Sequence, residues 1–180
     1  SDYLKDNNNL EEVFSSFQIT GNSSNWSSHG HKWNDFTVDL PGTPIQENNP
    51  KTQLLVSSDC EFQSIDKNGF YYRLKRSGLH DKYYIEEDTF ELSYIADKFQ
   101  EELKFKETNR TFTQYKGFPT LRTICSDSNE WIHSQYIIKG PHYYQMIART
   151  RDSSVPEHFF NSLKFKVPNY LFPFDQCEDT

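Results

Sequence analysis

The most informative segment of the sequence is Asp35-Phe36-Thr37-Val38-Asp39-Leu40-Pro41-Gly42-Thr43-Pro44. Apolar and polar residues alternate up to the first proline, which predicts a strand with one buried face, extending over 33–40. Proline has no backbone N–H to donate to a neighbouring strand, so the two prolines end this strand. The segment that follows carries no recognisable catalytic signature.

Downstream of this strand, the pattern predicts a hairpin and then a helix. Asn68-Gly69 favours a tight turn between extended segments at 52–65 and 70–74, because both residues tolerate positive φ. The apolar spacing then becomes that of an amphipathic helix, predicted over 89–104. Its stripe consists of Leu92, Ile95, Ala96, Phe99 and Leu103.

A second group of strands follows the helix. Short turns separate them, as is typical of antiparallel neighbours. A Ser-x-x-Glu pattern then predicts a short helix beginning at 154–157. We therefore expect an α+β fold, a single antiparallel β-sheet flanked by helices, which is an α-β-α sandwich. The four strands are predicted over 111–116, 120–126, 131–139 and 142–149.

The expected domain organisation has three parts. Residues 1–32 form a lead-in segment with a short helix at 10–17 and a polar loop at 22–28. The α+β domain covers 33–167, and 168–180 form a C-terminal tail.

Four motifs, in this order, are Phe36-x-Val38-x-Leu40-Pro41-Gly42-x-Pro44, Gly117-Phe118-Pro119, Gly140-Pro141-His142-Tyr143-Tyr144-Gln145-Met146 and Phe159-Phe160-Asn161-Ser162-Leu163-Lys164-Phe165. They resemble the PsbP-like superfamily, which includes the lumenal extrinsic subunit of photosystem II and the Mog-type Ran-binding proteins. The chain looks closest to bacterial envelope proteins of unknown function. The resemblance implies an α-β-α sandwich and a role in binding proteins, and it supplies no catalytic residues to carry over.

The composition excludes some classes of partner. The chain has 180 residues, a net charge of −7 and 16% aromatic residues, so aromatic rings compensate for few aliphatic side chains in the core. A nucleic-acid groove needs clustered Lys and Arg, which this acidic chain does not offer, so we expect a protein partner and no nucleic acid. Acidic residues along the predicted helix form either a solvated face or a docking face for a basic partner.

The expected location is the periplasm or the cell envelope. No apolar run approaches the roughly 20 residues that a membrane-spanning helix needs. The sequence begins with Ser1 and not with Met. We expect a leader, a lipid anchor or a preceding domain upstream, and an extracytoplasmic protein anchored by it.

Cysteine and histidine spacing indicates no metal or cofactor. Cys60 and Cys125 fall in predicted strands, where they form either a disulfide or two buried thiols, and Cys177 lies in the polar tail. His29 and His31 have metal-like spacing, but a stable site needs three or four ligands, and no third stands at helical or hairpin spacing.

The sequence therefore predicts a non-catalytic interaction or structural support domain. It contains no nucleophile elbow, phosphate-binding loop or zinc-protease motif. Paired tyrosines either pack beneath helices or form an exposed aromatic groove, and a domain that merely spaces an assembly is a further possibility. The alternative function is a small-ligand-binding protein or a hydrolase with an unrecognised site. The candidate partner-binding residues are Tyr143, Tyr144 and Phe118.

Overall fold

The computed structural model describes residues 25–30, 35–47, 60–78, 88–103, 105–140 and 142–166. The helix expected at 10–17, His31, Cys177 and the tail from 168 lie outside the described residues. The described elements are β1 (Trp26–Gly30), β2 (Phe36–Pro41), β3 (Ile45–Glu47), β4 (Cys60–Ile65), β5 (Tyr71–Gly78), α2 (Asp88–Glu102), β6 (Lys106–Tyr115), β7 (Phe118–Ser126), β8 (Trp131–Lys139), β9 (His142–Thr150), α3 (Glu157–Ser162) and β10 (Lys164–Phe165).

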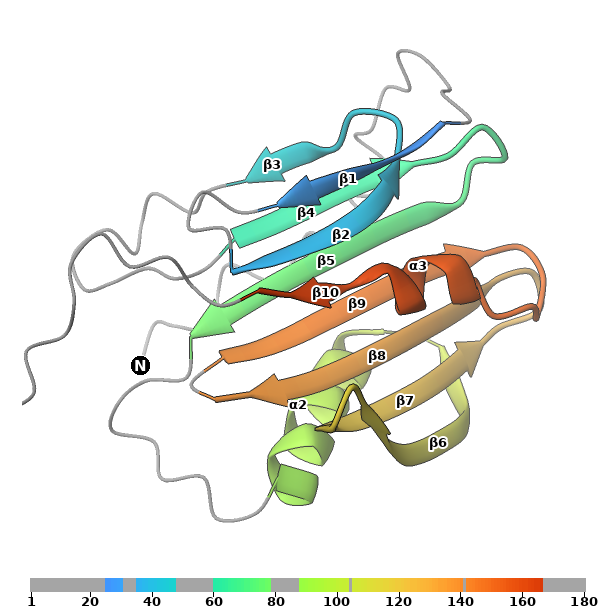
Figure 1. Ribbon diagram of the computed structural model, residues 1–180. Helices are drawn as coiled ribbons and strands as arrows, with labels where there is room; N and C mark the ends of the chain where they lie inside the picture. Colours follow the sequence, from blue (N-terminus) through green and yellow to red (C-terminus); the bar gives the residue numbers. More distant parts are fainter. Residues whose placement is uncertain are drawn as a thin grey trace, which may run out of the picture.

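The strands form two sheets (Figure 1). The larger sheet has seven strands in the order β3-β4-β5-β9-β8-β7-β6, and the smaller sheet has three in the order β1-β2-β10. Every pairing in both sheets is antiparallel, as the short turns predicted. β6 forms one edge of the larger sheet, and a bulge between Glu107 and Asn109 interrupts its pairing with β7.

Both faces of the larger sheet are covered (Figure 1). One face packs against the smaller sheet and α3, with rings of Phe36 and Phe159 at the centre of the interface. The other face packs against α2 over β7 and β8. Covering on both sides explains why β8 is buried from Ile132 to Ile138, since neither face of the strand meets water.

The helix predicted at 89–104 is confirmed as α2. Leu92, Ala96 and Phe99 are buried against the sheet, while Ile95 and Leu103 are partly buried beside them. Asp88 and Glu91 occupy the first turn, where negative charge interacts favourably with the helix dipole.

The expected single sheet flanked by helices is wrong. The layer opposite α2 is built mainly from the three-stranded sheet, and the described residues contain two short helices against ten strands. The polar segment around Ser27 was expected as a loop, but it forms β1, which pairs with β2 in register from Trp26 opposite Pro41 to Gly30 opposite Thr37. Serine-rich composition concealed this strand, whose inward contact comes from Trp26 packing edge-on against Tyr72.

Several boundaries also differ from the prediction. β3 was missed because it has only three residues, and β6 begins at Lys106, earlier than expected. The predicted short helix is present as α3, but it begins at Glu157, after Pro156, and no side chain caps it. The Ser154 hydroxyl donates to Asp152 instead of to the helix.

The two described cysteines are free and buried. Cys60 lies in the core facing the smaller sheet, whereas Cys125 lies beneath α2, so the sheet separates the two thiols. Burial raises the pKa of the Cys125 thiol to about 11. The disulfide between them is therefore excluded, and the buried-thiol alternative holds. No helix among the described residues has the length and apolar character needed to cross a membrane.

Candidate functional site

Two tight turns and β10 meet at one end of the larger sheet. The turn between β6 and β7 has positive φ at Lys116 (53°) and Gly117 (84°), and that between β8 and β9 has positive φ at Gly140 (55°). Glycine adopts this conformation without strain, so the sequence can reverse direction within two residues. These turns place Phe118 at the start of β7 beside Lys139 at the end of β8.

Phe118, a predicted partner-binding residue, is half-buried in an aromatic cluster. Its ring meets Phe165 edge to face, with the ring centroids 5.2 Å apart. The ammonium group of Lys139 lies over both rings, 5.6 Å from the centroid of Phe118 and 5.5 Å from that of Phe165. A cation over an aromatic face is attracted to its electrons, which holds Lys139 at this place.

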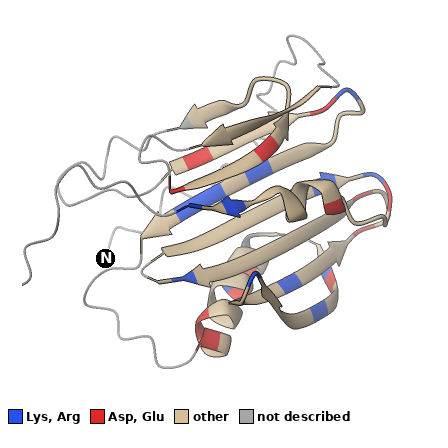
Figure 2. Ribbon diagram, viewed as in Figure 1, with Lys and Arg blue, Asp and Glu red and all other residues tan. Residues whose placement is uncertain are grey.

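Two more lysines lie nearby. Lys164 directly precedes Phe165 on β10, and Lys116 Nζ lies 5.0 Å from the centroid of the Tyr115 ring. We call Lys116, Lys139, Lys164, Phe118 and Phe165 the basic patch. Lys116 Nζ donates to the carbonyl of Leu163 at 2.6 Å. Burial, with the nearby charge of Lys164, lowers the pKa of Lys116. None of the three lysines pairs with a carboxylate within the described part of the chain. Figure 2 shows basic residues on β10 and at the adjacent end of β8.

The other two predicted residues lie elsewhere. Tyr144 is 1% exposed and packs edge to face against Phe36 and Phe165 in the core, and burial raises the pKa of its hydroxyl to about 12. Tyr144 therefore has almost no exposed surface with which to contact a partner. Tyr143 points to the opposite face and packs, partly buried, against the cluster under α2. The predicted trio therefore does not form one surface.

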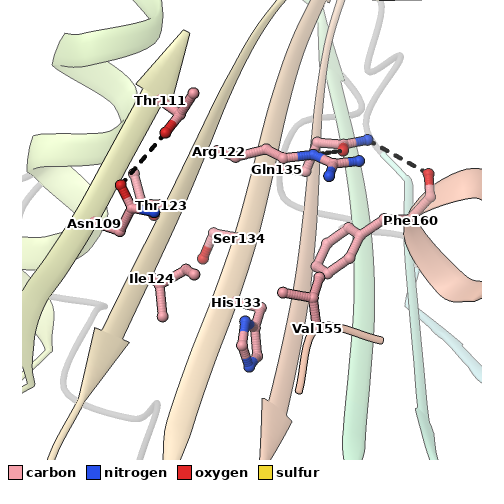
Figure 3. Close-up of a pocket in the computed structure, with 10 residues that line it drawn as sticks. All are labelled: Asn109, Thr111, Arg122, Thr123, Ile124, His133, Ser134, Gln135, Val155 and Phe160. Atoms are coloured by element: carbon pink, nitrogen blue, oxygen red, sulfur yellow. Dashed lines mark hydrogen bonds between the residues drawn. The ribbon is translucent and has the colours of Figure 1, made fainter. Parts of the chain in front are cut away.

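A second candidate site is a groove of about 250 Å³ beside α3. Its floor is formed by β6, β7 and β8, and its wall by Val155 and Phe160 (Figure 3). We call it the α3 groove. Residues of both polar and apolar character line it, namely Asn109, Thr111, Arg122, Thr123, Ile124, His133, Ser134, Gln135, Val155 and Phe160.

Arg122 and Gln135 form the ordered end of the α3 groove. Arg122 Nε donates to Gln135 Oε1 at 2.7 Å, and Gln135 Nε2 donates to the carbonyl of Phe160 at 3.5 Å (Figure 3). Arg122 also reaches Glu157 at 3.4 Å across the rim. These bonds link the sheet to α3 and fix the guanidinium group in place.

His133 occupies the floor of the α3 groove, 2% exposed, and neither ring nitrogen makes a hydrogen bond within the described residues. The backbone carbonyl of Asp152 approaches the ring without reaching the geometry of a hydrogen bond to it, and it accepts a bond from Thr150 Oγ1 at 2.7 Å. Burial lowers the pKa of His133, and this effect outweighs the attraction to Asp152, so the imidazole is neutral at pH 7.

The sequence analysis did not single out His133. The described residues contain no group of three or more His, Cys, Asp or Glu side chains that could hold a metal ion, and His29 instead contacts Ser27 Oγ at 2.8 Å. The sequence signal that could have found it is the pair of polar residues His133 and Gln135, two positions apart in a strand that is mostly apolar.

Comparison with solved structures identifies the fold. Over 83% of this chain and 96% of the other, the structure matches the cyanobacterial PsbP protein CyanoP from Synechocystis, with a TM-score of 0.53 and 8% sequence identity. A protein of unknown function from Pseudomonas aeruginosa matches over 77% of this chain and 89% of its own, with a TM-score of 0.44 and 10% identity. No family model and no curated protein sequence matches the chain. The chain therefore has a PsbP-like fold, as the sequence motifs had indicated.

Proposed function

We propose that this protein is a non-catalytic interaction domain that binds an acidic protein segment at the basic patch. The observation that carries the proposal is Lys139 over the rings of Phe118 and Phe165, with Lys116 and Lys164 close to each other beside it. These three lysines have no carboxylate partner among the described residues. On a chain with a net charge of −7, such a group is a local reversal of charge. Opposite charges across an interface speed association and select partners.

The chemistry of the patch defines the partner. The half-buried rings offer an apolar contact, and Lys139, held over both of them, offers a charge at their centre. A segment with one apolar side chain flanked by Asp or Glu fits this arrangement. Aromatic residues at the centre of a contact commonly supply most of its binding energy.

Two further features support a non-catalytic role. His133, the buried histidine of the α3 groove, forms no hydrogen bond with a hydroxyl or thiol of the described residues that it could activate. Cys125 lies on the other face of the sheet with a raised pKa, whereas a reactive thiolate needs a lowered one.

The test uses a fluorescent peptide with a central Leu between Asp and Glu residues, measured by anisotropy. Lys139→Glu is expected to weaken binding by about 1–2 kcal/mol, with affinity falling as salt rises. Lys98→Glu on α2 is the matched control, because it makes the same charge change at a lysine outside the basic patch. Equal binding by both variants, or none by the wild type, contradicts the proposal.

We also propose, from the sequence expectation alone, that the protein works outside the cytoplasm. Cell fractionation of the natural host, with an antibody against this domain, tests the location. Recovery in the cytoplasmic fraction overturns the proposed location.

A screen against ester, peptide and phosphate substrates tests the absence of catalysis. Turnover of any of these substrates that His133→Asn abolishes overturns the non-catalytic role.

A further inference from the structure

The α3 groove contains a buried imidazole with unused hydrogen-bonding capacity. His133 and Lys139 stand at opposite ends of β8, so the α3 groove is separate from the basic patch. A neutral imidazole has one donor and one acceptor, and a buried polar group without a partner is destabilising. A ligand that supplies both partners to His133 removes this penalty, and the gain appears as binding.

The charges around the groove favour an uncharged ligand. Arg122 is the one cation among the described lining residues, and Glu157 offsets it at 3.4 Å. Asp152 lies near His133, and Glu157 lies beside Arg122. The carboxylates of Asp152 and Glu157 both repel an anion that approaches the floor of the groove. A cation approaching the groove meets Arg122. The remaining lining side chains carry no charge.

The lining is suited to a ligand with hydroxyl groups on one side and an apolar face on the other. Asn109, Thr111 and Gln135 bring amide and hydroxyl groups to the groove. Ile124 and Val155 supply apolar surface beside His133 (Figure 3). Binding pockets for small molecules combine such apolar walls with a few fixed polar groups.

The size of the groove limits the ligand. Its volume of about 250 Å³ equals roughly eight times the 30 Å³ that a water molecule occupies in the liquid. We propose that the α3 groove binds a single sugar ring, an uncharged polyol, with His133 donating to one hydroxyl and accepting from another. Thr111 and Asn109, on the exposed rim, then bind hydroxyls on the outer side of the ring.

Protein-observed NMR tests the proposal with glucose, galactose, mannose and N-acetylglucosamine as probes. At least one sugar is expected to shift the amide signals of Ile124, His133 and Gln135. Acetate and methylammonium, the charged probes, are expected to leave these signals unchanged. Shifts with a charged probe alone, or with no probe at all, overturn the proposal, the latter result meaning that water alone fills the groove.

Two variants assign the binding to named groups. His133→Phe keeps a planar ring but removes both nitrogens, and it is expected to weaken sugar binding about tenfold. Thr111→Val, which removes one exposed hydroxyl and leaves the fold intact, is expected to weaken it about threefold. Thr113→Val is the matched control on the same strand, since Thr113 does not line the groove. Equal affinity for all three variants and the wild type overturns the assignment.

Discussion

At the scale of single residues, His133 links the acidity of the medium to the stability of the fold. Its folded pKa lies below the ordinary value of 6.5 because burial disfavours the charged form. Above pH 6.5 the imidazole is neutral in both the folded and the unfolded chain. Below that value the unfolded chain binds a proton that the folded chain does not bind, so the unfolded state gains stability.

We therefore predict that the free energy of unfolding falls as the pH is lowered below 6.5, through the interval down to the folded pKa of His133. Urea unfolding at a series of pH values measures this free energy of unfolding. His133→Asn is expected to flatten this dependence, because the variant has no titrating group there. His158→Asn is the control, since His158 is 60% exposed at its side chain. An unchanged slope in His133→Asn refutes the attribution.

At the scale of elements, α2 is stabilised by its contact with β7 and β8. Leu92 is 1% exposed, whereas Tyr94, two residues along the same helix, is 54% exposed. Truncating a buried side chain leaves a cavity as well as removing apolar surface from the core. The same truncation on the solvent side of a helix changes little.

Leu92→Ala is predicted to destabilise the protein by about 2–5 kcal/mol, and Tyr94→Ala by less than about 0.5 kcal/mol. Chemical denaturation of both variants under the same conditions measures the difference. Similar losses in the two would mean that the helix does not pack through the Leu92 face.

The elements that the sequence predicted are those with a strong local pattern. α2 has a clean 3.6-residue spacing, and β8 was predicted with its observed ends, because apolar residues and short turns mark both. β1 could not be predicted, since its Ser-rich composition is that of a loop and its pairing with β2 is a tertiary effect.

The candidate sites also depend on tertiary contacts that local sequence patterns do not predict. Phe118 was predicted from a motif and lies in the basic patch, but its neighbours Lys164 and Phe165 come from a strand at the far end of the chain. The α3 groove is lined by β6, β7, β8, α3 and the loop before α3. Strand order is set by packing between distant segments, so no local pattern in the sequence could bring these residues together.

At the scale of the whole molecule, a buried ion pair joins the two sheets. Arg76 Nε on β5 lies 2.8 Å from Asp35 Oδ2, just before β2, and the two side chains are 3% and 5% exposed. Arg76 also contacts His142 Nε2 at 2.9 Å. Removing one partner of such a pair leaves an uncompensated charge in the core, whereas replacing both with apolar side chains does not.

Asp35→Leu is predicted to cost about 3–5 kcal/mol, and the combination with Arg76→Met to recover most of that loss. Thermal unfolding of the single and double variants measures both effects. A single variant as stable as the wild type, or a double variant no better than the single, would show that the pair does not couple the sheets.

The pairing of β2 with β10 has a consequence for how the chain is made. Phe36 lies opposite Phe165, and β5 pairs with β9, so both sheets join segments that lie far apart in the sequence. Such distant contacts require large loops to close before any energy is gained, which slows folding. During synthesis, β1 and β4 emerge before β2 and β5, with which they pair, but β10 and β9 emerge long after them. One edge of β5 therefore stays open to pairing with other chains until β9 is made, and one edge of β2 until β10 is made, and an open strand edge favours aggregation.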